Sequence, residues 1–436
     1  MASVDTPTPS EPVTGAVADG EVPLEVAASA PVLATTLGGY LRAWWKRMRS
    51  GESGVLPVVG GLIVLSIIFQ TQSSYFLTAG NITALMVQGL AFVVLGMAEV
   101  WLLVLGEIDL SVGYVSAIGA AITATLISPP HPWPLWVAMP VGIVVTGAIG
   151  ALWGLIVIRL HVASFIVTLA GLLGSEGVLI WLVNSFGTGG GGTIRIENNV
   201  FLDLTSGNLS PVAGWVVTIA AVVVFGGVIF LRDRSRRRSG LVAPPQVVTV
   251  AKIAGLAAAG VALVLVCNTN RGELVTLRGI PYGVVIVIAL VALTSFMLGR
   301  TRFGRYLYAI GANEEAARRA GVSLAWNRLW AFVLTGATAG VGGMLYASRL
   351  GSVSNNVDGG TLVLYAVAAA VIGGASLFGG RGKMAHALLG GIVIATIYNG
   401  MGLIGLAADY QYMVTGLVLL AAVTVDALAR RGRTTS

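Results

Sequence analysis

The amino-acid sequence predicts an all-α polytopic membrane protein with about twelve transmembrane helices and with both termini in the cytoplasm. The prediction rests on composition, on a succession of apolar segments and on the distribution of basic residues. Of the 436 residues, 56% are hydrophobic and only 10% are charged, and the mean hydropathy is +0.87. Soluble domains carry about 25% charged residues, so a chain this apolar could not cover its own core in water.

Apolar segments of transmembrane length follow one another through most of the chain. A helix needs about 20 residues to cross about 30 Å of hydrocarbon. The segments lie at 54–70, 82–105, 112–127, 134–158, 164–183, 211–231, 247–267, 281–298, 328–347, 361–378, 385–405 and 410–428. The third and the tenth show the weakest pattern. The 59 glycines suit such a bundle, because small residues let membrane helices approach closely.

Basic residues alternate along the chain in a way that predicts orientation. With the N-terminus inside, the basic loops all fall on the cytoplasmic side, as the positive-inside rule requires. These loops hold Arg159 and the residues at 232–238, 299–321, 379–383 and 429–433, whereas the opposite loops hold only Arg195, Arg271, Arg278 and Arg349. The net charge of +7 therefore indicates membrane lipid as a partner and no nucleic acid.

The ends of the chain differ from its apolar middle. Residues 1–39 are rich in Pro, Thr, Ala and acid without Lys or Arg, which predicts a disordered cytoplasmic tail. Residues 40–53 place Trp44 and Trp45 beside basic side chains, which predicts a basic amphipathic juxtamembrane segment; an ordinary basic flank would explain the charges almost as well. Residues 429–436 are expected to form a second cytoplasmic tail.

The sequence offers no set of residues for catalysis, for a metal or for a cofactor. Its single cysteine, Cys267, excludes an internal disulfide, and no HExxH motif is present. The run "FGGRGKM" is not a phosphate loop, since Leu377 occupies the first glycine position and Met384 replaces the Ser or Thr. We therefore expect no enzyme activity, and the energy for any uphill transport must come from a gradient or from another subunit.

Two acids interrupt the apolar pattern in "GEIDLSVG", residues 106–113. A carboxylate at bilayer depth costs about 2.5–3.5 kcal/mol on insertion scales, so Glu107 and Asp109 need water, a partner or a function. The glycines at both ends suggest irregular backbone, which membranes tolerate only where it is buried in protein or lines a cavity. Asp109 could instead cap the helix that begins near Ser111.

Residues 312–322 predict a short helix in the longest basic loop. Asn313 can cap it, and Glu314 and Glu315 then fall in the first turn, where the helix dipole favours acid. Gly321 follows as the C-terminal stop. The helix is either a docking element for another protein or a solvated loop helix without a partner.

Here the sequence resembles a known family. "GANEEAARRAGV" looks like the coupling loop of ABC-importer permeases, and "GEIDLSVG" resembles the "GGIDLSVG" signature of the ribose/xylose-type sugar permeases. "SFIVTLAGLL", "AVIGGASLFGGRG" and "IYNGMGLIG" follow the same pattern, in order, within residues 54–428. The resemblance implies the permease subunit of an ATP-driven monosaccharide importer in the branched-chain/monosaccharide permease superfamily, in the cell membrane of a prokaryote.

The resemblance also implies partners and site residues. The partners would be ABC ATPase subunits, an extracytoplasmic sugar-binding protein and a second permease copy or close paralogue. The residues expected to couple to the ATPase are Gly311, Asn313, Glu314, Glu315, Ala316, Ala317, Arg318 and Gly321. Those expected at the translocation path or gate are Glu107, Asp109, Ser111, Tyr398 and Asn399. For Asn399, a hydrogen bond between helices is the alternative.

The chain departs from the family pattern at three places. Glu107 replaces the commoner glycine, and Glu176 stands where ribose-type relatives tend to have a basic residue. Residues 211–278 form an extra two-span hairpin around "RDRSRRRSGLVAPP", which we expect to be a mobile cytoplasmic loop near anionic lipid. Longer xylose-type permeases are the closer comparison, which predicts xylose or another pentose or hexose as the substrate.

A gradient-driven secondary transporter is the main alternative. Intramembrane Glu107, Asp109 and Glu176 would suit proton coupling. Such transporters usually show repeated halves, and no convincing internal repeat is present here. The helix at 312–322 would also have no role in that mechanism.

Overall fold

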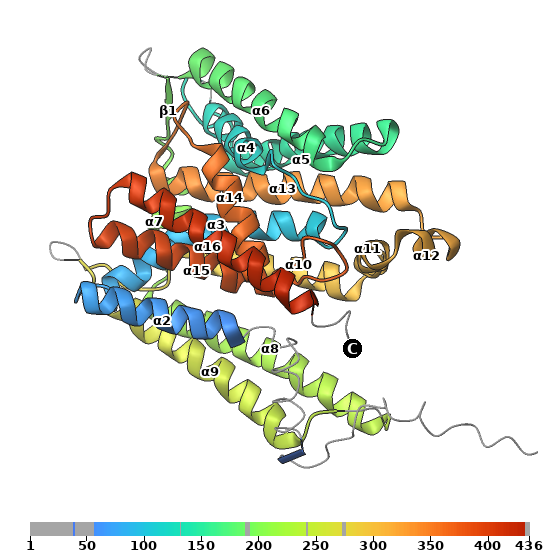
Figure 1. Cartoon of the computed structure of the whole chain (residues 1–436). Coiled ribbons are helices and arrows are strands. Elements are labelled where there is room, and N and C mark those ends of the chain that lie inside the picture. Colours follow the sequence, from blue (N-terminus) through green and yellow to red (C-terminus); the bar gives the residue numbers. More distant parts are fainter. Residues whose placement is uncertain are drawn as a thin grey trace, which may run out of the picture.

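The computed structural model describes residues 38–39, 56–130, 132–187, 192–240, 243–272 and 276–431. Within these ranges the chain is almost entirely helical (Figure 1). The two strands found there, β1 (Thr193–Arg195) and β2 (Ser352–Ser354), pair antiparallel with Ile194 opposite Val353. Apart from residues 38–39, the expected N-terminal tail and juxtamembrane segment lie outside the described residues, as do residues 432–436.

Every predicted apolar segment coincides with a helix. Eight helices of the described ranges are long and apolar enough to cross a membrane: α3 (Ala79–Leu103), α5 (Leu135–Leu160), α6 (Ser164–Phe186), α8 (Pro211–Arg238), α9 (Gln246–Asn268), α10 (Tyr282–Arg300), α13 (Leu324–Leu350) and α15 (Met384–Leu403). The shorter apolar helices are α2 (Leu56–Gln72), α4 (Val112–Leu126) and α14 (Gly359–Ile372), and α16 (Ala408–Arg431) is the last. An all-α polytopic membrane fold is confirmed; the count of twelve spans and the side of the termini remain predictions.

Three short helices occupy the loops. They are α7 (Asn199–Ser206), α11 (Arg302–Ala312) and α12 (Glu314–Arg319). Helices α11 and α12 lie at one end of the bundle, and β1 lies at the opposite end (Figure 1). Following the distribution of basic residues, we call these the cytoplasmic end and the outer end.

Helices α3 and α13 form the centre of the bundle. In α3, 83% of the most apolar stretch is buried. Helix α13 packs against α3, α4 and α5, and glycine makes this contact possible. A Cβ added at Gly343 would lie 1.9 Å from the carbonyl oxygen of Ser116, and one at Gly150 would lie 2.2 Å from that of Phe332. The backbones therefore touch directly, as small residues allow in membranes.

The two weakest predicted spans are the two shortest of these helices. Helix α4 has 15 residues and α14 has 14, so neither crosses about 30 Å of hydrocarbon by itself. Irregular segments complete them: 104–111 leads into α4, and 373–383 follows α14. The two irregular segments meet where the Gly380 N–H donates to the carbonyl oxygen of Val104 at 2.9 Å.

The α8–α9 hairpin stands outside the bundle (Figure 1), with only 11% of the most apolar stretch of each helix buried. Its two ends lie together, because the Leu209 N–H donates to the Ile280 carbonyl oxygen at 2.8 Å. Arg271 fastens the hairpin to the bundle by donating to Thr83 at 2.8 Å and to Asn208 at 3.0 Å.

The basic end of this hairpin corrects the expectation of a mobile loop. Helix α8 continues through Arg238, so residues 232–238 are helical. Buried Asp233 accepts a hydrogen bond from Thr249 at 2.9 Å, and Arg237 donates to the Pro244 carbonyl oxygen at 3.0 Å. These contacts between α8 and the start of α9 hold the charged turn in helical form.

Glycine packing at Gly343 can be tested against a matched glycine. Gly343→Ala places a methyl group against the backbone of α4, and overpacking typically costs about 1–3 kcal/mol. Gly174→Ala in α6 is the control, because nothing lies within 4 Å of a Cβ there. Thermal unfolding in detergent should show a lower midpoint for Gly343→Ala and an unchanged or higher one for Gly174→Ala. Equal midpoints would contradict the close contact.

The hairpin can be tested by excision. Deleting residues 211–278 joins Ser210 to Gly279 as a two-residue turn, and the positive φ of +104° at Gly279 suits such a turn. Because an even number of spans is removed, the remaining helices should keep their orientation. An Arg305→Cys reporter should stay accessible only from the cytoplasm, as it should in the full chain carrying Cys267→Ser. Labelling from the outside would show that the span count is wrong.

Candidate functional site

Three segments meet backbone to backbone at the cytoplasmic end. We call this contact of Val104, Gly106, Gly311, Gly379 and Gly380 the glycine junction. A Cβ at Gly311, at the end of α11, would lie 1.8 Å from the Val104 carbonyl oxygen, and one at Gly379 would lie 3.0 Å from the Gly106 nitrogen. Gly311, which the sequence assigns to coupling, thus lies against the segment that leads into α4.

An arginine connects this segment to the short cytoplasmic helix. Arg328, in the first turns of α13, forms an ion pair with Glu107 through its Nε. Its Nη2 also lies 3.4 Å from the Glu314 carboxylate. The side chains of Arg328 and Glu107 are 21% and 10% exposed, against 45% for Glu314.

Asp109 and Ser111 shape the entry to α4. Asp109 is 1% exposed, and its Oδ1 accepts from the Ser111 N–H at 2.8 Å and from the Ser111 hydroxyl at 2.6 Å. Ser111 itself occupies the N-cap position and makes no side-chain cap bond. The expectation that Asp109 caps α4 is therefore corrected: Asp109 orders the turn immediately before the helix.

The sequence reasoning overlooked Glu99, which lies about one turn before the end of α3, the span that precedes the break. Glu99 is fully buried, and neither of its carboxylate oxygens has a hydrogen-bond partner among the described residues. It lies close enough to Asp109 for their charges to interact. An isolated acid in "MAEVWLLVL" is the signal that could have identified it, because such acids are rare in spans. No group of three or more metal-ligating acids, His or Cys occurs within the described ranges.

The short cytoplasmic helix forms where the sequence predicts it. Asn313 caps α12 by accepting from the Ala316 N–H at 2.9 Å, and Gly321 ends the turn with a φ of +77°. Glu314 and Glu315 each pair with Arg318, at 3.6 and 3.7 Å.

One residue of α12 differs from the expectation. Ala317 is only 5% exposed and packs into the main hydrophobic core, so its side chain anchors the helix and presents no docking surface. A helix of 3.6 residues per turn that lies on the bundle must turn one position inward, and here that position is Ala317. Glu314, Glu315, Ala316 and Arg318 remain exposed to the cytoplasm.

Asn399 forms a reciprocal amide pair between α15 and α3. Asn81 Nδ2 donates to Asn399 Oδ1 at 2.9 Å, and Asn399 Nδ2 donates to Asn81 Oδ1 at 3.0 Å and to Gln88 Oε1 at 3.3 Å. This arrangement corresponds to the interhelical alternative for Asn399, since its amide hydrogens are occupied by protein partners.

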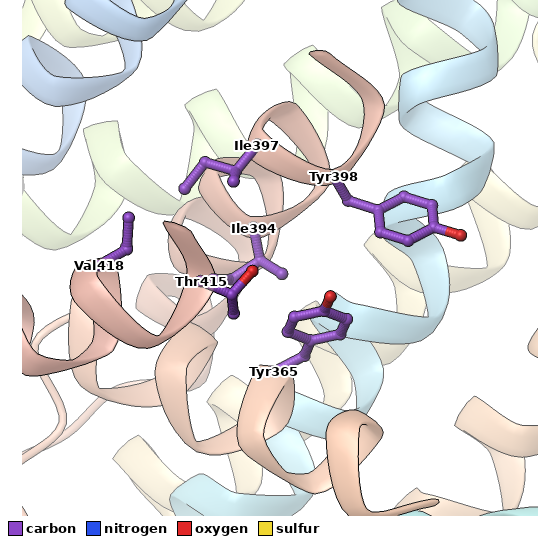
Figure 2. Close-up of a pocket in the computed structure, with 6 residues that line it drawn as sticks. All are labelled: Tyr365, Ile394, Ile397, Tyr398, Thr415 and Val418. Carbon is purple, nitrogen blue, oxygen red and sulfur yellow. The ribbon is translucent and has the colours of Figure 1, made fainter. Parts of the chain in front are cut away.

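Tyr398 lines a crevice between three helices of the outer half. Tyr365 from α14, Tyr398 from α15 and Thr415 from α16 converge there (Figure 2), and Ile394, Ile397 and Val418 complete the lining. The rings of Tyr365 and Tyr398 are 6.3 Å apart and nearly perpendicular, at 73°. The crevice has no room for a water molecule, its accessible lining is almost entirely apolar, and the Tyr398 hydroxyl points away from Thr415 (Figure 2).

The expected path residues do not form one cluster. Asn399 bonds to Asn81 in the first turn of α3, whereas Glu107 lies just beyond the last turn of α3. At 1.5 Å per residue, α3 separates the two places by about 30 Å. The site thus consists of an outer crevice and a cytoplasmic junction, joined by α3 and α13.

The comparisons with known proteins cover most of the chain, and they agree with one another. Residues 75–423 match the family described as branched-chain amino acid transport system / permease component. The chain is 31% identical to the xylose transport system permease protein XylH of Escherichia coli strain K12, covering 94% of this chain and 98% of XylH. It is 29% identical to the D-allose transport system permease protein AlsC of the same strain, covering 84% and 89% of the two chains.

A third relative, the ribose import permease protein RbsC of the same strain, is 27% identical over 89% of this chain and 95% of its own. No solved structure matches the chain. The family match and the coverage of these relatives, together with the membrane fold, show that the chain belongs to the branched-chain transport permease family and is a sugar ABC permease of the ribose/xylose type.

Proposed function

We propose that this chain forms the translocation path of an ATP-driven monosaccharide importer and couples that path to a separate ATPase. The observation that carries the proposal is α12, a capped helix on the cytoplasmic end of a sugar permease. Relatives are named for xylose, D-allose, L-arabinose and ribose, which supports a pentose or hexose as the substrate. The greater similarity to the xylose permeases favours a xylose-like sugar.

The exposed side of α12 is the proposed docking face for the ATPase. Glu314, Glu315, Ala316 and Arg318 supply charged and small side chains there. Asn313 and Gly321 fix the two ends of the helix, and buried Ala317 holds it against the bundle. The chain carries no phosphate loop, so ATP hydrolysis is assigned to the partner.

The other partners follow from the two ends of the bundle. An extracytoplasmic sugar-binding protein is expected at the outer end, near β1, β2 and α7. A second permease copy or a close paralogue completes the membrane part, in the cell membrane of a prokaryote. Arg234, Arg236 and Arg238 at the end of α8 are exposed and suit anionic lipid headgroups, each worth about 1 kcal/mol near the surface.

The proposed path runs from the outer crevice to the cytoplasmic junction. The aromatic faces of Tyr398 and Tyr365 suit the C–H groups of a sugar ring, and the crevice would have to open to admit one. Glu107, Asp109 and Ser111 are proposed to form the cytoplasmic gate, and Asn399 to hold α15 beside the crevice. Weak contacts are sufficient, because tight binding along a path slows release.

Proton-driven transport is the competing function, and Glu99 favours it. A buried carboxylate that has no ion-pair partner among the described residues and lies beside Asp109 is the kind of group that carries protons in membrane transporters. The two functions differ in their energy source, so uptake experiments separate them.

The energy source is tested in proteoliposomes with radiolabelled xylose, ribose, L-arabinose and D-allose. Uphill uptake should require ATP, the ATPase and the sugar-binding protein together, because the chain lacks a nucleotide site. The chain alone should show no accumulation under an imposed proton gradient. Proton-driven accumulation by the chain alone would overturn the importer proposal.

The docking face is tested by comparing a tryptophan placed on α12 with a tryptophan placed at the start of α13, beyond Gly321. Ala316→Trp puts a bulky side chain on the proposed face and should reduce co-purification of the ATPase roughly tenfold or more, as loss of interface complementarity does. Ala325→Trp, at an exposed alanine beyond α12, is the control and should co-purify normally. Normal assembly and transport in Ala316→Trp would leave α12 a solvated connector.

Gly321→Asp tests the geometry of the same helix. The left-handed backbone at Gly321 disfavours a side chain, and a new charge would lie at the end of the docking helix. Uptake should fall while the sugar-binding protein still binds, since it meets the opposite end of the bundle. Pull-down of the sugar-binding protein and uptake assays on the same preparation measure both effects.

A further inference from the structure

Arg328 bridges two parts of the chain that the mechanism needs to connect. Its guanidinium pairs with Glu107, in the irregular segment 104–111, and with Glu314, the first residue of α12. Glu107 stands two residues before Asp109, which orders the start of α4. The contacts therefore form a continuous connection from the proposed ATPase-docking helix to a membrane helix.

The two contacts of Arg328 differ in burial. The Glu107 side chain is 10% exposed, whereas the Glu314 side chain is 45% exposed. Buried ion pairs are costly to break, and exposed pairs contribute little. Arg328 should therefore stay with Glu107 while its contact with Glu314 forms and breaks.

Glu314 also has a second cation within reach. Arg318, on α12 itself, lies 3.6 Å from the Glu314 carboxylate, compared with 3.4 Å for Arg328. The two contacts exist together, with Arg318 on one carboxylate oxygen and Arg328 on the other. Glu314 therefore keeps an ion pair on its own helix if a change in position of α12 breaks its contact with Arg328.

The backbone supplies a second, independent contact along the same route. At the glycine junction, Gly311 lies directly against Val104, with no room for a Cβ between them. Gly311 immediately precedes the residues that begin α12. Movement of α12 therefore reaches the irregular segment both through Arg328 and through the chain backbone.

We propose that Arg328 is the positioning residue that transmits movement of α12 to the 104–111 segment and so to α4. The inference rests on the proposed docking of an ATPase at α12. It gives Glu107 a role that the glycine of the "GGIDLSVG" signature could not fill, since glycine has no side chain to pair with Arg328. Arg328 needs no contact with the sugar.

The connection is tested first on the full-length chain alone, in lipid nanodiscs, by hydrogen–deuterium exchange. Arg328→Gln should speed exchange in the peptides covering 104–111 by roughly fivefold or more, because local stability sets exchange rates. Arg236→Gln, which removes an exposed cytoplasmic arginine from α8, should leave these peptides unchanged. Unchanged exchange in Arg328→Gln would overturn the proposed connection.

Coupling is then tested in the assembled importer by measuring sugar taken up per ATP hydrolysed. Arg328→Gln and Glu107→Gln should each lower this ratio roughly tenfold, with ATPase co-purification retained, and each should also lower the thermal midpoint, because the remaining buried charge is left unpaired. The double variant should be no worse than either single variant, because two residues that act as one unit are not additive. Arg328→Lys keeps the positive charge but lacks the planar guanidinium, so its ratio should lie between those of the wild type and Arg328→Gln.

The outcomes separate this inference from the proposed function. If the wild-type assembly shows no ATP-dependent uptake, the importer proposal fails, and the exchange experiment on the chain alone still decides the Arg328 connection. If the wild-type assembly transports and the Arg328 variants keep the normal ratio, the connection is wrong and the importer proposal stands. If the double variant, which removes both charges, regains thermal stability and also the normal ratio, Arg328 has a purely structural role and the inference is overturned.

Discussion

The structure depends on one constraint: inside hydrocarbon, backbone N–H and C=O groups must find partners within the protein. Most of the chain meets this constraint with long helices. Helices α4 and α14 are too short, so the segments 104–111 and 373–383 must satisfy their backbones by other means. They do so by packing on each other, with the Gly380–Val104 hydrogen bond at their meeting point. The same packing brings α11 into contact with both segments through Gly311.

The three acids around the break illustrate three ways of burying a carboxylate. Glu107 has an arginine, Asp109 accepts two hydrogen bonds from Ser111, and Glu99 has no hydrogen-bond partner among the described residues. Only the first arrangement joins the membrane segment to the cytoplasmic surface. A charge at Glu107 places Arg328 within reach of a second acid, Glu314 on the exposed helix α12, whereas Glu99 lies wholly within the helix packing.

Local patterns in the sequence predicted the helices but not their contacts. Hydropathy located all twelve apolar helices, and the Asn313 and Gly321 pattern located α12 with its cap, because both signals are contained in neighbouring residues. The pairing of Glu107 with Arg328 joins residues far apart in the chain, and no local pattern encodes it. The inward direction of Ala317 and the helical charged end of α8 likewise depend on tertiary contacts. Ala317 packs into the bundle core, and Asp233 bonds to a residue of α9.

The distance between the outer crevice and the cytoplasmic junction sets a requirement on the mechanism. The proposed sugar contacts near Tyr398, whose ring packs on Phe92 of α3, are separated from the cytoplasmic end of α3 by about 17 Å of helix, at about 1.5 Å per residue. Helix α13 spans this distance with Arg328 at one end and, further along, with Gly343 packed directly on the backbone of α4 at Ser116. Because those backbones touch without intervening side chains, a shift of α13 cannot be absorbed by side-chain rearrangement there. If α13 moves at its cytoplasmic end, α4 must therefore move with it, and the proposed coupling requires such a linked displacement.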